Sequence, residues 1–257
     1  MGKRTAYTPG TFCWADVIVP DPAAAKDFYG GLFGWTARDV SGGGYTFFAL
    51  DGENVAGLAA GPDGHPPVWL SYVAVADADR TAARAAELGG EVTMEPRDTG
   101  APVANPGRGA LLSDPQGAAV GLWQAGQHFG AGLVNDPGAM SWNHLITSDV
   151  ERATAFYTEL FGWTTDVMED SDPPFTVWRN SDGWLNGAVT ELPRDASDGP
   201  SWLVYFTTAD LDGALGRVAE LSGRLLVPET SISIGRFAVV GDPQGATFTL
   251  YEGKIDP

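Results

Sequence analysis

The most constraining feature of this 257-residue sequence is an internal repeat. The segment that starts at Trp14, WADVIVPDPAAAKDFYGGLFGWT, returns 128 residues later as WNHLITSDVERATAFYTELFGWT. The segment that starts at Gly107, GRGALLSDPQGAAVGLWQ, returns at the same spacing as GRFAVVGDPQGATFTLYE. This duplication excludes a single large domain and predicts two similar modules, at 1–125 and 141–257, joined by a Gly-rich linker at 126–140.

Each module contains two weaker copies of a shorter plan. A strand is followed by an aspartate, a helix of about 12 residues that ends at glycine, and three short strands. In the first copy, a strand at 13–19 leads to Asp21 and to a helix that Gly30 and Gly34 stop. The sequence therefore predicts an α+β fold of four βαβββ units. Because the short helices cover one side only, the other face of each curved mixed sheet is free to enclose a cleft.

Composition narrows the class of partner. The chain carries 15 Lys and Arg against 33 Asp and Glu, a formal charge of −18 that repels phosphate backbones and anionic lipid head groups. Nucleic acid and membrane partners are therefore excluded, and we expect a monomer or a homodimer. The single cysteine, Cys13, allows no internal disulfide. Since no signal-peptide pattern or long apolar run is present, we expect a cytoplasmic protein.

The repeated motifs carry a family resemblance. Four βαβββ units, a strand–Asp–helix that ends in FY…LFGW, and a closing DPxG hairpin before an apolar strand resemble the vicinal oxygen chelate superfamily. Glyoxalase I, bleomycin-resistance proteins, extradiol dioxygenases and fosfomycin-resistance enzymes belong to it. The resemblance covers 12–124 and 141–252. Within the superfamily, the chain is most similar to a tandem, glyoxalase-like subgroup of actinobacteria that is often labelled a hydroxylase.

The resemblance implies a divalent-metal site. Catalytic members use His, Gln or Glu near the start of the first strand and on the fourth, fifth and last strands. Carried over to this sequence, these positions fall at Trp14, Gly57, Ser71 and Gly121 in the first module, and at Trp142, Gly187, Val204 and Thr249 in the second. Nearly all lack a donor that a hard cation accepts, and the chain has three histidines in total. We therefore expect no metal ligands and no cofactor, with a divalent metal kept as the alternative.

Aromatic residues stand beside the missing ligands. Because side chains two apart on a strand share a face, alternation predicts which of them line the concave faces. The predicted ligand-binding residues are Trp14, Trp69, Ser71, Trp123, Trp142, Trp202, Thr249 and Tyr251. Small residues among them leave room for a flat molecule to stack. Core filling is the alternative interpretation of each aromatic ring.

Asp16 and His144 are the ionisable groups that alternation turns inward. Each is a candidate catalytic acid or base, or a partner for a phenol or quinone oxygen. The alternative for Asp16 is a purely structural acceptor of backbone or indole hydrogen bonds. The sequence leaves open whether the clefts form within one module or between two.

Three functions are compatible with these residues. The favoured one is metal-independent binding of a planar aromatic or polyketide-like molecule, for sequestration, resistance or an accessory role in natural-product tailoring. A metal-free cyclase or epimerase that uses Asp16 or His144 is the second. A glyoxalase-like lyase or an oxygenase (hydroxylase), as the resemblance implies, is the third. Whether the protein is an enzyme stays open at this level.

Overall fold

The computed structural model describes residues 2–62, 64–100, 105–169, 174–193 and 199–254. The first module contains β1 (Phe12–Val19), α1 (Pro22–Phe33), β2 (Thr36–Asp39), β3 (Tyr45–Leu50), β4 (Glu53–Ala60), β5 (Val68–Ala74), α2 (Ala78–Glu87), β6 (Glu91–Thr99), β7 (Gly107–Ser113) and β8 (Ala119–Ala125). The second contains β9 (Met140–Thr147), α3 (Val150–Phe161), β10 (Thr164–Met168), β11 (Phe175–Arg179), β12 (Leu185–Glu191), β13 (Ser201–Thr207), α4 (Leu211–Glu220), β14 (Arg224–Ile232), β15 (Gly235–Gly241) and β16 (Thr247–Gly253). The predicted plan of four βαβββ units in an α+β fold is confirmed.

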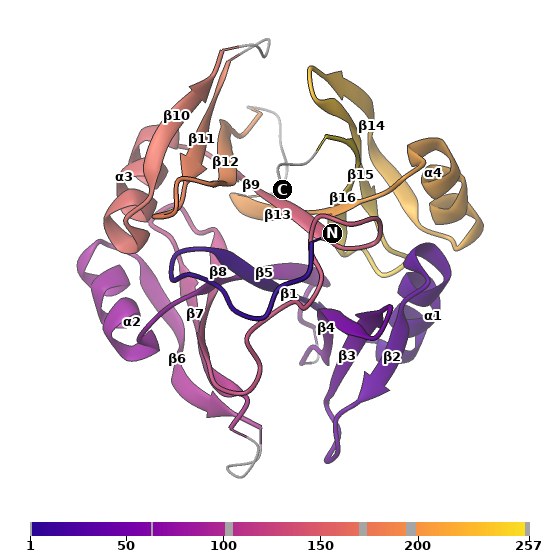
Figure 1. Ribbon diagram of the computed structural model, residues 1–257, viewed down its shortest axis with the longest axis horizontal. Coiled ribbons are helices and arrows are strands. Elements are labelled where there is room, and N and C mark those ends of the chain that lie inside the picture. The colour runs from indigo at the N-terminus through magenta and orange to yellow at the C-terminus, as the bar shows by residue number, and fades with distance from the viewer. Residues whose placement is uncertain (1, 63, 101–104, 170–173, 194–198, 255–257) are drawn as a thin grey trace.

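Each module forms its own eight-stranded mixed sheet. The strand orders are β2-β3-β4-β1-β5-β8-β7-β6 and β10-β11-β12-β9-β13-β16-β15-β14. The first strands of the two halves meet in the middle of each sheet, where β1 pairs antiparallel with β5, and β9 with β13. Both sheets are curved and open (Figure 1). Of the two arrangements that the sequence left open, each sheet is therefore formed within one module.

Aspartates begin all four helices of the described chain. Asp21, Asp77, Asp149 and Asp210 are N-caps whose carboxylates accept hydrogen bonds from backbone N–H groups of the first turn. α1 and α3 end at glycines in the left-handed conformation, which residues with a side chain adopt at a cost. The acidic turns and Gly34 are thus helix caps, whereas Gly30, also expected to stop the first helix, lies inside α1. None of these helices is long and apolar enough to cross a bilayer.

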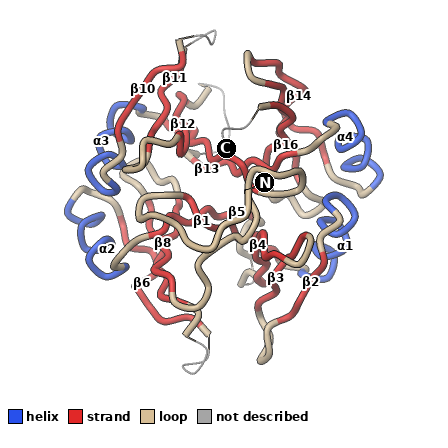
Figure 2. Tube along the Cα trace, viewed as in Figure 1, coloured by secondary structure: helices blue, strands red, loops and turns tan. Residues whose placement is uncertain are grey.

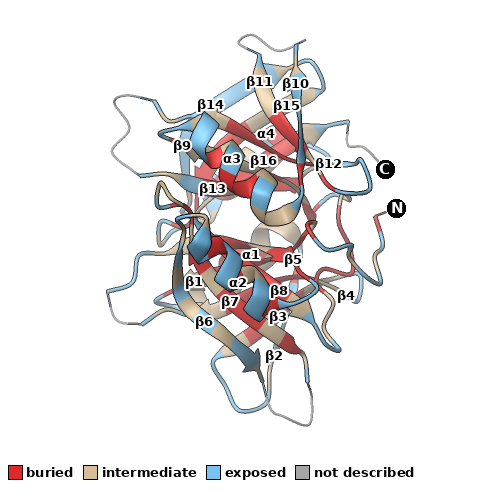
Figure 3. Ribbon diagram, turned by 90° about the vertical axis from the view of Figure 1, so that its left-hand side faces the viewer, coloured by how far each residue is buried: buried red, intermediate tan, exposed pale blue. Residues whose placement is uncertain are grey.

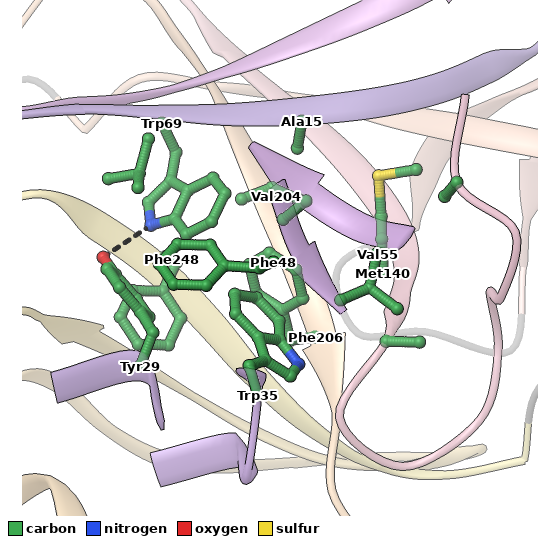
Figure 4. Close-up of a cluster of buried hydrophobic side chains, with 14 of the residues drawn as sticks. Ala15, Tyr29, Trp35, Phe48, Val55, Trp69, Met140, Val204, Phe206 and Phe248 are labelled. Carbon is green, nitrogen blue, oxygen red and sulfur yellow. Dashed lines mark hydrogen bonds between the residues drawn. The ribbon is translucent and has the colours of Figure 1, made fainter. Parts of the chain in front are cut away.

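The hydrophobic cores lie between the modules. α1 lies beside α4 and α2 beside α3 on the two flanks, with the strands between them (Figures 1 and 2). β5 contacts β13 in the centre, where buried residues concentrate (Figure 3). In one core, Trp35 and Phe48 of the first module pack against Phe206 and Phe248 of the second (Figure 4). The face of each sheet that carries the helices therefore contributes to joining the modules.

The repeated FY and DPQG motifs meet across the same boundary. Trp69 Nε1 donates to Tyr29 Oη at 2.9 Å, and Tyr29 Oη donates to Asp242 Oδ2 at 3.0 Å. The same arrangement recurs on the other side of the molecule. Trp202 Nε1 donates to Tyr157 Oη at 2.9 Å, and Tyr157 Oη donates to Asp114 Oδ2 at 3.1 Å. Each DPQG turn thus holds the tyrosine of the other module, which explains why both motifs recur at one spacing.

Candidate functional site

The face of each sheet opposite the helices is the candidate binding surface. We define the first inner face by Trp14, Asp16, Tyr45, Phe47, Tyr72 and Trp123, and the second inner face by the residues Trp142, His144, Phe175, Tyr205, Thr249 and Tyr251. In the first, Trp14 bonds to Asp16, and Trp123 Nε1 donates to the His128 carbonyl oxygen. In the second, His144 bonds to Thr190, and Thr249 and Tyr251 lie beside Tyr205 and Thr207 in the pairing of β13 with β16. The binding role of these residues stays a prediction.

Asp16 is enclosed by hydrogen-bond donors. Its Oδ1 accepts from Trp14 Nε1 at 2.8 Å and from Tyr45 Oη at 2.6 Å, and the Tyr72 hydroxyl also bonds to the carboxyl group. Only 8% of the residue is exposed, and this burial raises the pKa of Asp16 although the three donors oppose the shift. The geometry is that of a structural acceptor, which was the alternative interpretation of this residue.

Gly57 is required by this arrangement. It lies opposite Asp16 in the parallel pairing of β1 with β4. A Cβ atom at Gly57 would overlap Asp16 Oδ1 and Tyr45 Oη. The glycine at a position where the resemblance implies a metal ligand is therefore explained by the space that the Asp16 network occupies.

His128, from the linker, fills the first inner face. Its imidazole ring lies 4.5 Å from Trp14, 5.1 Å from Phe47 and 5.5 Å from Trp123, measured between ring centroids, and all three contacts are edge-to-face. Trp123 Nε1 donates to the His128 carbonyl oxygen at 2.8 Å. Burial lowers the pKa of His128 to about 4, so the ring is neutral at pH 7.

An open cavity of about 530 Å³ adjoins His128. Its wall combines Phe47, Phe129 and Gln127 with the polar group of Arg38, Glu53 and Asn54. Arg38 lies 5.0 Å above the Phe47 ring and donates to Asn54 Oδ1 at 3.3 Å. The volume is within the range of small-molecule sites, roughly 300–1,000 Å³.

The second inner face is built around His144. The ring bonds through Nε2 to Thr190 Oγ1 at 2.9 Å, while Nδ1 lies 3.5 Å from Tyr205 Oη. Phe175 and Tyr205 are stacked nearly parallel to it, with ring centroids 6.2 and 6.3 Å away. Burial lowers the pKa of His144 to about 4, which leaves a neutral imidazole between two hydroxyl groups at pH 7.

Further aromatic rings extend this face. Tyr205 contacts Phe237 at 6.0 Å between centroids, and Thr249 lies beside Tyr205 in the pairing of β13 with β16. Tyr251 Oη donates to the backbone oxygens of Ile234 and Lys254. Trp142 and His144 are partly exposed, whereas their counterparts Trp14 and Asp16 are buried. Within the described residues, neither hydrophobic core includes Trp142, Tyr205 or Tyr251.

The predicted inward direction of Trp69, Ser71 and Trp202 is wrong. The two tryptophans lie in the cores between the modules, and Ser71 Oγ donates to Asn143 Oδ1 of the other module at 2.6 Å. Val204 is likewise a core residue (Figure 4). β5 and β13 are apolar on both faces, so their hydrophobic pattern does not reveal which face is inward. The inward fifth-strand residues are Tyr72 and Tyr205.

With these corrections, the donor set can be tested against a divalent metal. The first inner face offers one carboxylate, Asp16, which is not at a ligand-equivalent position and already binds three donors. The second inner face offers one imidazole, His144, with Ala188 rather than Gly187 opposite it. No group of three or more His, Cys, Asp or Glu that could hold a metal occurs in the described part of the chain. The residues present do not fit a metal held by three protein ligands.

Sequence reasoning missed Tyr45, Tyr72, Phe175, Tyr205 and His128. The four aromatic residues lie on strands for which the repeated motifs do not indicate which side chains point inward. His128 lies in a segment without periodicity, and its contact with Trp14 spans a large separation in sequence. The one available signal was the small number of histidines, three in the chain, which allows each to be considered as a candidate site residue.

Comparisons with known proteins agree with the fold. The model of the Glyoxalase/Bleomycin resistance protein/Dioxygenase superfamily matches residues 11–122 and 139–250. "Putative glyoxylase CFP32" of Mycobacterium tuberculosis (strain CDC 1551 / Oshkosh) is 40% identical over 97% of both chains. "Anthracycline biosynthesis protein DauV" of Streptomyces sp. (strain C5) is 37% identical over 96% of this chain and 95% of its own.

A solved structure extends the likeness. The 2,3-dioxygenase LapB of Pseudomonas sp. KL28 superimposes with a TM-score of 0.67 at 15% identity, covering 98% of this chain and 95% of its own. At this identity the likeness concerns the fold alone. The duplicated sequence, the two open sheets and the double family match lead to one conclusion: the chain is a two-module member of the Glyoxalase/Bleomycin resistance protein/Dioxygenase superfamily.

Proposed function

We propose that the second inner face binds a planar aromatic molecule of the polyketide type, without a metal, in natural-product tailoring, sequestration or resistance. The observation that carries the proposal is the stacking of Phe175 and Tyr205 on a neutral His144, on a face whose other rings, Trp142 and Tyr251, belong to neither core. Trp142, Phe175, Tyr205 and Tyr251 provide aromatic faces and edges for stacking. The Tyr205 hydroxyl and the imidazole provide hydrogen bonds for a phenol or quinone oxygen.

The relatives support this class of ligand. DauV, whose name places it in anthracycline biosynthesis, matches almost the full length of the chain, so the similarity includes both modules. Anthracyclines contain fused planar rings with quinone and phenol oxygens, which is the chemistry that the second inner face offers to accommodate. A cytoplasmic location and a monomeric or homodimeric state stay predictions.

The absence of a metal is part of the proposal. A lone imidazole is a weak ligand set for a divalent cation, because stable sites combine three or more donors. Purification without chelator followed by elemental analysis tests it: we expect substoichiometric Mn, Fe, Ni and Zn. One equivalent of any of them per chain would overturn metal independence and favour the glyoxalase-like or oxygenase function.

Metal-free proton transfer is the second candidate, because His144 is held between two hydroxyl groups. A neutral imidazole at pH 7 can accept a proton, although a pKa of about 4 makes it a weak base in the free protein. Asp16 is a poorer candidate, since its carboxylate is enclosed by three donors. Binding is therefore favoured over a cyclase or epimerase. His144→Gln separates the two functions: retained binding with loss of turnover would indicate catalysis.

Titration with an anthracycline aglycone, followed by tryptophan fluorescence, tests binding directly. We expect saturable quenching with a Kd of roughly 1–10 µM and one ligand per chain. Trp142→Leu should weaken binding about tenfold, because it removes a stacking ring. Trp184→Leu is the matched control, since Trp184 is 54% exposed and does not belong to the second inner face. Absence of saturable quenching, or equal effects of the two substitutions, would contradict the proposal.

A further inference from the structure

The first module also has a ring-binding arrangement, but a residue of the chain itself occupies it. Trp14, Phe47 and Trp123 surround the His128 ring with edge-to-face contacts at 4.5–5.5 Å, a geometry typical of aromatic recognition. We call these three side chains the aromatic box. We propose that the aromatic box is a binding site for a small, neutral, planar aromatic ring, and that His128 fills it as an intramolecular ligand.

The hydrogen bonds at His128 support exchange rather than permanent packing. The backbone is held firmly, because His128 N donates to the Pro106 oxygen at 2.9 Å and its carbonyl accepts from Trp123. The imidazole ring is not held by its Nε2 atom, which is buried and has no hydrogen-bond partner among the described residues. A leucine or phenylalanine would fill the same space without burying an unpaired polar atom. Trp14 and Trp123 belong to one of the hydrophobic cores and Phe47 packs against it, but core packing alone does not account for the unpaired imidazole nitrogen at this position.

The surroundings offer a route for an incoming ring. The cavity of about 530 Å³ shares Phe47 and His128 with the aromatic box. On the far side of the cavity the linker is anchored independently, as Ala131 N donates to the Cys13 oxygen and Gly132 N to the Asn54 oxygen. The side chain of His128 can thus be removed without releasing the linker from the sheet. A vacated box would open into this cavity.

Replacing the ring with free imidazole tests the proposal. In His128→Ala, a hole the size of imidazole should bind the free molecule at about pH 8, where imidazole is mostly neutral, with a Kd of roughly 1–10 mM. At a tenfold excess over Kd, the Tm of the variant should rise by about 2 °C, and the tryptophan fluorescence should change with the same saturation curve. Wild type, and His65→Ala in an exposed loop, should show neither response.

Each outcome decides the matter. A folded His128→Ala that responds to imidazole no more than wild type would overturn the proposal. If that variant does not fold, His128→Ser replaces it, and folding rescued by imidazole supports the proposal. Failure of both variants to fold even with imidazole would mean that the ring is an obligatory core residue, which contradicts it.

The number of aglycone molecules bound per chain provides a second test, which rests on the proposed function. Wild type should bind one aglycone per chain, because His128 blocks the first inner face. Two equivalent sites in wild type would contradict the blocking role of His128. Absence of aglycone binding anywhere would refute the proposed function but leave the imidazole experiment unaffected, so the two failures are distinguishable.

Discussion

The two inner faces start from the same motif and differ in what covers them. In the first, Asp16 binds three donors and His128 fills the space between Trp14 and Trp123. In the second, His144 takes the place of Asp16 and remains partly exposed among aromatic rings. The comparison teaches that one framework can place different groups at the same position: a buried carboxylate enclosed by donors in the first face, and a half-buried imidazole in the second.

The opposite faces have stayed alike. The relay of Trp69, Tyr29 and Asp242 has a matching copy in the other half of the molecule, with nearly equal distances. These residues join the two modules, so a change on one side alone would leave a buried hydroxyl or indole without its partner. Divergence is therefore concentrated where the sheets do not hold the modules together.

The largest expected difference between the faces concerns Gly57 and its counterpart Ala188. Gly57→Ala forces a Cβ into Asp16 and Tyr45 and should lower the free energy of unfolding by about 4 kcal/mol. Ala188→Gly, opposite His144, should cost about 1 kcal/mol, the usual penalty of glycine in a strand. Denaturant unfolding followed by circular dichroism measures both. Equal losses would mean that the Asp16 network is not tightly packed.

Removing the ionisable group itself should have the next largest effect. Asp16→Ala removes the acceptor of the Tyr45 hydroxyl in a buried setting and leaves Trp14 Nε1 with Tyr45 Oη as its remaining acceptor, which should cost about 3 kcal/mol of unfolding free energy. Asp16→Asn keeps an acceptor oxygen and should cost less. His144→Ala removes one hydrogen bond at 2.9 Å and should cost about 1 kcal/mol. A larger loss at His144 than at Asp16 would reverse the structural and accessible roles of the two faces.

The pH dependence of stability should show what the two faces share. His128 and His144 have pKa values of about 4 in the folded protein, below the ordinary value of about 6.5. Between these values the unfolded chain binds more protons, so stability falls as the pH drops from about 6.5 to about 4. Each ring should contribute about 2 kcal/mol of this loss by pH 4.5.

Substitution isolates each contribution to this pH dependence. His128→Phe and His144→Gln should each reduce the loss, whereas His65→Gln in an exposed loop should not. Asp16 acts in the opposite direction, because a raised pKa stabilises the folded state as the pH falls below it. Unfolding curves at several pH values compare the variants with wild type. An unchanged slope in either histidine variant would mean that its ring is not buried in the neutral form.

The smallest expected effects are those of two tyrosine hydroxyls on ligand affinity. Tyr205→Phe removes a hydroxyl on the second inner face and should weaken aglycone binding about fivefold, a change of about 1 kcal/mol. Tyr72→Phe removes its counterpart, which bonds to Asp16, and should leave the affinity unchanged. Fluorescence titration measures both. Equal weakening would assign the ligand to both faces.

Much of the fold could be predicted from the sequence because its signals are local and repeated. The N-cap aspartates and the terminal glycines of α1 and α3 act within one helical turn, and the duplication shows each signal twice. The candidate site was predicted in part. Trp14 and Asp16 bond to each other, as alternation along β1 expects, because β1 adjoins the repeated motif.

The sequence does not predict which side chains of β5 and β13 point to the inner face and which point to the core. VWLSYVA is buried or half-buried along its whole length, so hydrophobicity does not distinguish the face that joins the modules from the inner face. Trp69 and Trp202 were therefore assigned to the wrong face. Their aromatic character is explained by the cores between the modules, in agreement with the core-filling alternative.

The sequence by itself determined the duplication, the four βαβββ units, the family and the scarcity of metal donors, since each depends on residue types and short-range spacing. Tertiary structure alone decided that each sheet is formed within one module, that Tyr29 bonds to the other module's Asp242, and that His128 fills the first inner face. The physical reason is that these contacts join residues far apart in the chain. Their energies come from packing and buried hydrogen bonds, which leave no periodic pattern in the sequence.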